Sequence, residues 1–189
     1  MKDLKPAILL FIAFTIICGG IYPLVVAGIA SVAFPKQAGG SFITDRSGRE
    51  LGSRLIGQPF SAPKYFWPRP SATTDFAYNP AASGGSNLGP TNPDYLKTVA
   101  GRVKALRDAG ITGSVPADLV QASASGLDPQ ISRKAAMIQI PRIARARGMS
   151  EEELTGVVAA HTEERQLGFL GERRVNVLAL NLALDNIKP

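Results

Sequence analysis

The chain has 189 residues, a formal net charge of +6, one cysteine and one histidine. Its basic residues are spread out without a run of Lys or Arg, which argues against nucleic acid as a partner. A single cysteine excludes an intrachain disulfide, and the roughly 150 residues beyond the apolar N-terminal segment are enough for one domain with its own core.

The N-terminal segment is the most apolar part of the chain. Between Pro6 and Pro35 there is no Asp, Glu, Lys or Arg, and this run exceeds the roughly 20 residues that a helix needs to cross a bilayer. A cleavable signal peptide is the alternative, because Ser31-Val32-Ala33 resembles a cleavage site, but signal h-regions have only about 7–15 residues. We predict a short cytoplasmic tail over residues 1–6, a transmembrane helix over residues 7–34 and a soluble domain over residues 35–189. The flanking charges alone leave the orientation open.

Small residues recur at helical spacing within this apolar segment. Thr15 and Gly19 are four residues apart, as are Ala27 and Ser31, and such pairs allow a second helix to approach closely. We predict that these four residues contact a membrane partner. The alternative is that they reflect the ordinary composition of membrane helices, in which small residues are common.

The soluble segment begins with a predicted hairpin. Two short apolar stretches, Ser41–Thr44 and Leu51–Ile56, flank the turn signal Asp45–Gly48. The chain is then rich in Gly, Pro, Ser and Asn as far as Pro93, which predicts long ordered loops.

Helical signals dominate from Asn92 onward. Asn92 is a suitable cap with Pro93 at the first helical position, and the apolar face that follows ends near Gly110. These patterns predict an α+β fold: one N-terminal transmembrane helix, then one soluble domain with an N-terminal β-hairpin and loops, then several helices. The further helices are expected near Val115-Pro116, from Asp128-Pro129 to Arg147 with a kink or a split at Pro141, from the Ser150/Glu153 capping box to about His161, and over Val175–Leu184, where a strand remains possible.

The sequence contains few signs of catalysis. It has no phosphate-binding Gly-rich loop ending in Gly-Lys-Ser or Gly-Lys-Thr, no dinucleotide fingerprint and no Gly-x-Ser-x-Gly elbow. No His, Cys or carboxylate cluster has the spacing of metal ligands. His161 could form a hydrolytic triad only with distant residues such as Ser125 and Asp128, so an anchored hydrolase is a remote alternative to a helix-end histidine.

Three loops have unusual composition. Tyr65–Ala72 combines rigid aromatics with an arginine, which predicts that Trp67 and Arg69 contact a protein partner. Ser83–Pro93 is rich in Gly and Asn, and its turn Ser83, Gly84, Gly85 and Ser86 could offer backbone amides to the phosphates of a nucleotide. Ser123–Pro129 ends in a predicted helix cap. The alternative for each loop is an ordered turn whose polar residues satisfy the backbone.

Many of these loop sequences together form a specific pattern. The chain resembles the KdpC family, the small single-span subunits of bacterial potassium-transporting P-type ATPases, over nearly its full length. It departs from the family at Gln121–Ala124, where Thr-Ala-Ser-Gly is more usual. The segments that carry the resemblance include Leu55–Gln58, Arg69–Ala72, Ser83–Asn92, Ser125–Pro129 and Val175–Asp185.

The resemblance implies partners rather than catalysis. It implies a KdpA-like potassium-selective pore subunit, a KdpB-like P-type ATPase subunit, a KdpF-like small peptide and membrane lipid. It also implies no covalently bound cofactor, with ATP binding possible through the complex. The chain itself has neither an Asp-Lys-Thr-Gly-Thr phosphorylation motif nor a Thr-Val-Gly-Tyr-Gly filter.

The resemblance also implies a location and two roles. The chain is then a single-pass protein of the cytoplasmic (inner) membrane with its domain on the extracytoplasmic side. The family is assigned a catalytic-chaperone role that raises the ATP affinity of the P-type subunit, whereas assembly and stabilisation fit a domain outside the cytoplasm better. A free-standing anchored module that binds an envelope ligand is the alternative from another class.

Overall fold

The computed structural model describes residues 3–45 and 47–187. The chain divides into two compact units, residues 1–51 and residues 52–189, which we call the N-terminal and the C-terminal unit. Part of the predicted tail, residues 1–2, and Arg46 of the predicted turn lie outside the described residues.

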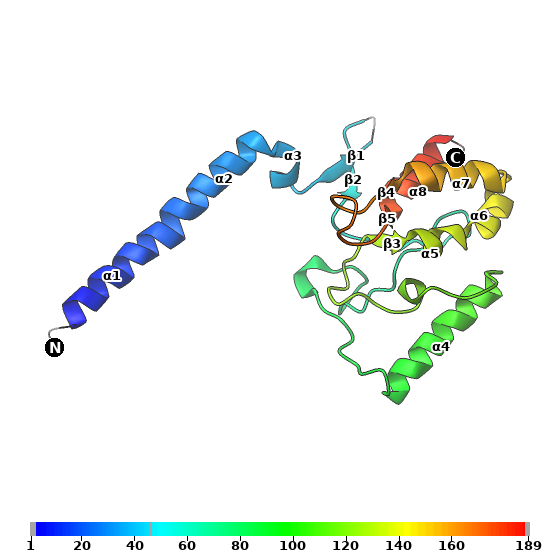
Figure 1. Cartoon of the computed structure of the whole chain (residues 1–189), viewed down its shortest axis with the longest axis horizontal. Helices are drawn as coiled ribbons and strands as arrows, with labels where there is room; N and C mark the ends of the chain where they lie inside the picture. The colour runs from blue at the N-terminus through cyan, green and yellow to red at the C-terminus, as the bar shows by residue number, and fades with distance from the viewer. Residues whose placement is uncertain (1–2, 46, 188–189) are drawn as a thin grey trace. The chain divides into compact units, whose positions relative to one another are not determined.

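The N-terminal unit contains one continuous apolar helix (Figure 1). It comprises α1 (Leu4–Ile16), a π-helical turn (Ile17–Ile21) and α2 (Tyr22–Ala33). Pro23 has no N–H to donate to the preceding turn, and the ladder widens there, with the Tyr22 N–H bonded to the Ile17 carbonyl. Over Leu4–Ala33 this helix is 30 residues long, enough by length and composition to cross a membrane.

A short hairpin follows the apolar helix. After α3 (Pro35–Ala38), the strands β1 (Phe42–Thr44) and β2 (Glu50–Ser53) pair as predicted. The Asp45 carboxylate holds the turn between them, because its Oδ1 accepts from the backbone N–H groups of Ser47 (2.8 Å) and Arg49 (3.0 Å). The hydrogen bond from the Ser47 hydroxyl, followed by that from the Arg49 N–H, lowers the pKa of Asp45.

The C-terminal unit is built on a three-stranded sheet. Its strands are antiparallel in the order β3-β5-β4, with Ile131 opposite Val175 and Thr162 on the other side of Val175. Helices α5 to α8 pack with this sheet around a core that includes Ile143, Leu154 and Leu180. The strands are β3 (Gln130–Ser132), β4 (Thr162–Glu163) and β5 (Arg174–Asn176), and the helices are α4 (Pro93–Asp108), α5 (Arg133–Met137), α6 (Ile140–Arg147), α7 (Glu151–Ala160) and α8 (Val177–Ile187).

The observed fold is the predicted α+β fold, and several helix ends match their sequence signals. Asn92 caps α4 through its side chain, and Ser150 with Glu153 forms a complete capping box at the start of α7. Gly148 ends α6 in the left-handed conformation. The chain splits ahead of Pro141, which occupies the first turn of α6, where no N–H is needed.

Three predicted elements differ from the structure. The helix predicted near Val115-Pro116 is only a 3₁₀ turn at Ala117–Leu119, and the helix predicted from Asp128 begins instead with strand β3. The last segment is a short strand, β5, followed by α8, so both interpretations of Val175–Leu184 hold in part. Strands of two or three residues are too short to produce a recognisable alternation in the sequence.

Candidate functional site

Two buried amide side chains hold the aromatic loop (residues 65–72) against the helices. The Phe66 N–H donates to Asn181 Oδ1 (2.8 Å), and Asn181 Nδ2 donates back to the Phe66 carbonyl (3.0 Å). Gln139 forms the same reciprocal pair with Trp67, at 2.7 and 3.2 Å. These side-chain amides make the hydrogen bonds that a neighbouring β-strand would otherwise make with the loop backbone. The backbone is therefore fixed, and the Phe66 side chain packs in the core.

Arg142 holds the same loop and lies over the face of the Trp67 ring. Its guanidinium donates to the carbonyls of Pro63 (2.5 Å) and Tyr65 (2.9 Å) and lies 4.1 Å from the centre of the Trp67 ring. Burial lowers the pKa of Arg142 to about 10. The Trp67 indole N–H donates to the Ala62 carbonyl. Trp67, predicted as a partner contact, is therefore half-buried and engaged within its own domain.

A second arginine fastens the start of the loop to the last helix. Arg147 forms an ion pair with Asp185 on α8 (2.7 Å) and donates to the Lys64 carbonyl (2.7 Å). The Tyr65 hydroxyl donates to the other oxygen of Asp185 (2.9 Å). Desolvation, together with this bond to a carboxylate, raises the pKa of Tyr65. Helices α6 and α8 thus position the first part of the aromatic loop.

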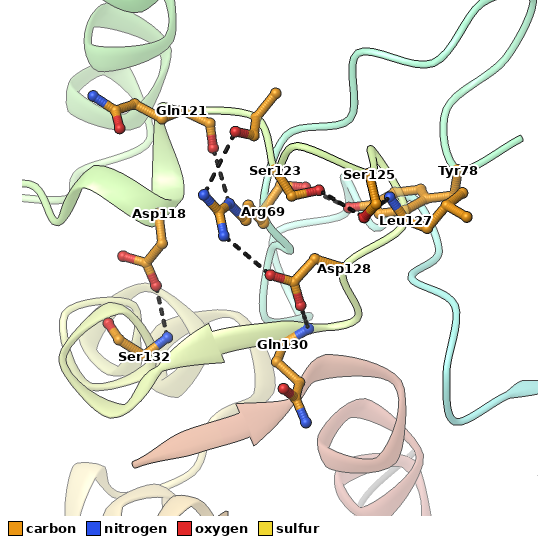
Figure 2. A network of polar contacts seen from close by, with 11 residues as sticks. Arg69, Tyr78, Asp118, Gln121, Ser123, Ser125, Leu127, Asp128, Gln130 and Ser132 are labelled. Atoms are coloured by element: carbon orange, nitrogen blue, oxygen red, sulfur yellow. Dashed lines mark hydrogen bonds and ion pairs between the residues drawn. The ribbon is translucent and has the colours of Figure 1, made fainter. Parts of the chain in front are cut away.

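Arg69 joins the aromatic loop to the turn at residues 121–128 (Figure 2). It forms an ion pair with Asp128 (3.0 Å) and donates to the backbone carbonyls of Gln121 (3.2 Å) and Ala122 (3.5 Å). The Tyr78 hydroxyl donates to the Arg69 carbonyl, and burial raises the pKa of Tyr78. The Arg69 side chain remains 29% exposed and borders an open hollow of about 440 Å³. Arg69 therefore organises two loops and is still partly accessible from outside.

Two aspartates connect this network to the sheet. Asp128 Oδ1 accepts from the Gln130 N–H (3.0 Å), and Asp118 Oδ2 accepts from the Ser132 N–H (2.6 Å). Both contacts fall on strand β3, as Figure 2 shows. The carboxylates of Asp118 and Asp128 thus bond the loops that carry them to strand β3 of the sheet.

The Gly-rich turn (residues 83–86) packs against the turn at residues 123–126. The Gly84 N–H and the Ser83 hydroxyl both donate to the Ser125 carbonyl, at 2.9 and 3.0 Å. Gly85 passes so close to Ala124 that an added Cβ would lie 3.1 Å from the Ala124 carbonyl oxygen. Neither glycine has a positive φ, so the turn lacks the alternation of an anion-binding nest, and one of its amides is already engaged.

A hollow of about 340 Å³ lies beside the Gly-rich turn. Its only charged lining residue is Arg102 of α4, which also donates to the Val120 carbonyl (2.8 Å). Burial lowers the pKa of Arg102, and Tyr95 opposes this shift. Arg102 could not be predicted as a site residue from the sequence, because a lone arginine on a helix gives no signal. The hollow is lined by residues 85–88, Tyr95, Thr98, Arg102 and residues 121–124.

The residues of the remote hydrolase alternative are not connected. His161 ends α7 with its Nδ1 2.9 Å from the Val157 carbonyl, while Asp128 is occupied by Arg69. Ser125 Oγ accepts from the Leu127 N–H. Among residues 3–45 and 47–187, no hydrogen bond joins these three side chains, and no group of three or more potential metal ligands occurs.

The predicted packing residues of the apolar helix are exposed in this chain. The hydroxyls of Thr15 and Ser31 donate to carbonyls four residues earlier, at 2.8 Å in each case. These bonds satisfy both hydroxyls without a partner helix. Gly19 has no atom within 4 Å of the position of an added Cβ, and Ala27 is exposed. The contact with a partner that we predict for these residues and for Arg69 and Trp67 stays a prediction.

Comparisons with known proteins give matches along nearly the whole chain. The model of the family described as "KdpC: K+-transporting ATPase, c chain" matches residues 4–186. A protein of Geobacter sulfurreducens named potassium-transporting ATPase KdpC subunit is 75% identical over 189 residues, covering 100% of both chains. Proteins of the same name are 71% identical in Geobacter metallireducens, over 100% of both chains, and 54% identical in a Janthinobacterium species, over 96% of both. The chain therefore belongs to the KdpC family, the accessory subunits of the K+-transporting ATPase.

Proposed function

We propose that this chain is the non-catalytic subunit that assembles and stabilises a high-affinity, ATP-driven potassium uptake complex. The proposal rests on one observation above all, the 75% identity over the full 189 residues with a potassium-transporting ATPase KdpC subunit. Its partners are then a KdpA-like pore subunit, a KdpB-like P-type subunit and a KdpF-like small peptide. On this proposal the chain supplies structure to the complex, and its partners carry out the chemistry.

Two features of the chain support a role in assembly. The apolar helix exposes Gly19 and Ala27, so a neighbouring helix can approach its backbone closely. In the C-terminal unit, hydrogen bonds to the helices fix the aromatic loop, and hydrogen bonds to the Ser125 carbonyl fix the Gly-rich turn. Both segments can therefore bind a partner without an ordering cost. We infer that the helix anchors the chain in the inner membrane and that these loops contact the pore subunit.

The position of the domain determines which role is available to it. We place it on the extracytoplasmic side, where it would shape the outer potassium entrance and would not meet ATP. Protease added to sealed vesicles of known orientation should then cleave the C-terminal unit only from the extracytoplasmic face. Cleavage from the cytoplasmic face would overturn this placement.

Purification of the tagged full chain in mild detergent tests the assembly role. We expect it to co-purify with large polytopic subunits, and Gly19→Leu or Ala27→Leu to lower the yield of complex while leaving membrane insertion intact. A matched control is Val32→Leu, which changes an apolar residue that is already bulky and exposed. A monodisperse single chain would instead support the free-standing envelope module.

Direct contact with a nucleotide is the second version of the function. One observation favours it: Arg102 lines the hollow beside Ser86 and is the single cationic side chain in that lining. We regard this version as the weaker one, because the Gly84 amide is engaged by Ser125 and neither glycine adopts a nest conformation.

Nucleotide titration of the full chain in detergent separates the two versions. We expect no saturable, competitor-sensitive ATP binding, and therefore no difference between wild type and Arg102→Met. Saturable binding that is lost in Arg102→Met and in the double variant Gly84→Val with Gly85→Val would support the chaperone role instead.

A further inference from the structure

The segment between β4 and β5 reverses direction at an exposed apolar turn, residues 166–170. Leu167 is 82% exposed, Phe169 69% and Leu170 47%. Three large apolar side chains are therefore exposed within four successive positions of one turn, rather than scattered singly over the domain. Contiguous exposed apolar surface in a folded domain commonly marks a contact with a membrane or another protein.

The backbone of this turn is well defined and unfavourable for leucine. Gln166 and Leu170 exchange N–H to carbonyl bonds of 3.0 and 2.9 Å, and the Phe169 N–H reaches the Gln166 carbonyl at 3.3 Å. Leu167 and Gly168 both have positive φ, 53° and 83°, as the central residues of a type I′ turn do. Asn or Gly is favoured at the first of these positions. Leu167 is thus unfavourable in both conformation and solvation, which indicates a role outside its own domain.

The charges at the base of the turn sum to zero, since Glu163, Glu164 and Glu172 stand against Arg165, Arg173 and Arg174. Arg173 pairs with Glu164 (2.7 Å) and Arg174 pairs with Glu163 (3.0 Å). The tip itself, residues 167–171, carries no charge. An uncharged apolar tip above a base of zero net charge is suited to the boundary between lipid headgroups and acyl chains, where its attraction does not depend on anionic lipid.

The base of the turn also lies next to the start of the C-terminal unit. Glu163 forms a second ion pair with Arg54 (3.1 Å), and Asn176 Nδ2 donates to the Arg54 carbonyl (2.8 Å). The C-terminal unit begins at Gly52, directly bonded to the unit that contains the apolar helix. The covalent link therefore tethers the C-terminal unit to the membrane that holds the helix, and this unit starts two residues before Arg54.

We propose that the apolar turn inserts Leu167, Phe169 and Leu170 into the interfacial layer of the bilayer in which the apolar helix is anchored. The turn provides a second, reversible attachment to lipid, and it does so without help from other subunits. This proposal rests on the anchoring role of the helix and adds a lipid contact that the assembly role does not require. A protein surface as the occupant is the competing outcome.

Depth-dependent quenching in vesicles tests the proposal on the full chain. In a Cys18→Ser background, Glu172→Cys carries an environment-sensitive fluorophore beside the turn, and Lys97→Cys carries it on α4 as a control. The chain alone is reconstituted into vesicles that contain nitroxide-labelled lipid. We expect several-fold stronger quenching at position 172 than at position 97, and no loss of it at about 1 M salt, where screening is nearly complete.

Substitutions in the turn separate insertion from a structural role. Leu167→Asn with Phe169→Gln should reduce quenching at position 172 to the level of the control without lowering the melting temperature, because Asn accepts positive φ more readily than Leu. Phe76→Gln is the matched control, since Phe76 is 60% exposed elsewhere in the domain. This control should leave quenching unchanged.

Three outcomes would overturn the proposal. If the chain stays in the membrane during alkaline extraction but quenching at position 172 is weak, only the insertion of the turn is overturned. If alkali extracts the chain from the membrane, both the anchor and the insertion are overturned. Shielding of the label that appears only after other subunits are added would assign the turn to a protein contact. A melting temperature that falls in the turn variant with unchanged quenching would assign it a structural role.

Discussion

Gln139 and Asn181 are the residues on which the aromatic loop most depends. Each is almost fully buried, and each satisfies one backbone N–H and one carbonyl of the loop. A buried amide costs free energy unless both of its ends are bonded, and here both are. Asn181 could have been noticed in the sequence as a polar residue within an apolar run, but its partner 115 residues away could not.

Replacing Asn181 by leucine tests this dependence. The change keeps the size of the side chain and leaves the Phe66 N–H and carbonyl buried without partners, so we expect a loss of about 2–5 kcal/mol in the free energy of unfolding. Asn186→Leu on the same helix is the control, because Asn186 is exposed, and it should change stability by less than about 0.5 kcal/mol. Denaturant unfolding in detergent measures both, and equal effects would contradict the account.

Tyr78 should make the domain sensitive to alkali. Burial raises the pKa of its hydroxyl above the ordinary 10.0, so above pH 10 the unfolded chain releases a proton that the folded chain retains. Stability present below pH 10 is then lost as pH rises, by up to about 1.4 kcal/mol per pH unit. Tyr78→Phe should remove this contribution to the pH dependence, with a separate loss of about 1 kcal/mol at neutral pH from the bond to Arg69. Tyr95→Phe is the control, and an unchanged slope in Tyr78→Phe would refute the assignment.

Arg69 separates an internal role from a role at an interface. Arg69→Ala removes the ion pair with Asp128 and bonds to two carbonyls, so we expect unfolding to become easier by about 1–3 kcal/mol. Thermal unfolding and the yield of complex should be measured on the same variant. A normal melting temperature with a lost complex would show that Arg69 acts mainly as a partner contact, as its residue type indicated.

At the scale of elements, local signals were readable and long-range pairings were not. The starts of α4 and α7 and the end of α6 follow from capping residues that interact within a few positions. Strand β3 and the ion pair between Arg69 and Asp128 depend on partners far along the chain, 59 residues apart for the ion pair. The sequence predicted which loops are unusual, whereas only the structure shows that they hold one another.

The contact between the Gly-rich turn and the turn at residues 123–126 gives a sharp test at this scale. Gly126 has a φ of 69°, and an added Cβ would lie 2.7 Å from the Gly84 carbonyl oxygen. Gly113 has a φ of 83° with nothing within 4 Å. Both alanine variants lose roughly 1 kcal/mol from backbone strain, but Gly126→Ala should lose about 1–3 kcal/mol more by overpacking. Equal melting temperatures for the two variants would show that the turns do not depend on this contact.

At the scale of the whole molecule, the chain combines an apolar helix with a domain whose loops are fixed by hydrogen bonds and ion pairs within the domain. The helix offers an anchor and small residues at its surface, while the domain offers fixed loops and, in our proposal, a second contact with lipid. This division is what an accessory subunit requires, because it can hold membrane partners together without carrying out their chemistry. Membership of the KdpC family identifies the transporter to which these features belong.

The most direct measurement examines the partner subunits in cells that lack this chain. We predict that the pore subunit and the P-type subunit, solubilised in mild detergent, no longer elute together and lose potassium-stimulated ATP hydrolysis. Re-expression of the full chain should restore both, and Gly126→Ala should restore them less well than Gly113→Ala. An intact complex with normal potassium-stimulated ATP hydrolysis in the absence of the chain would contradict the central claim that it assembles and stabilises the transporter.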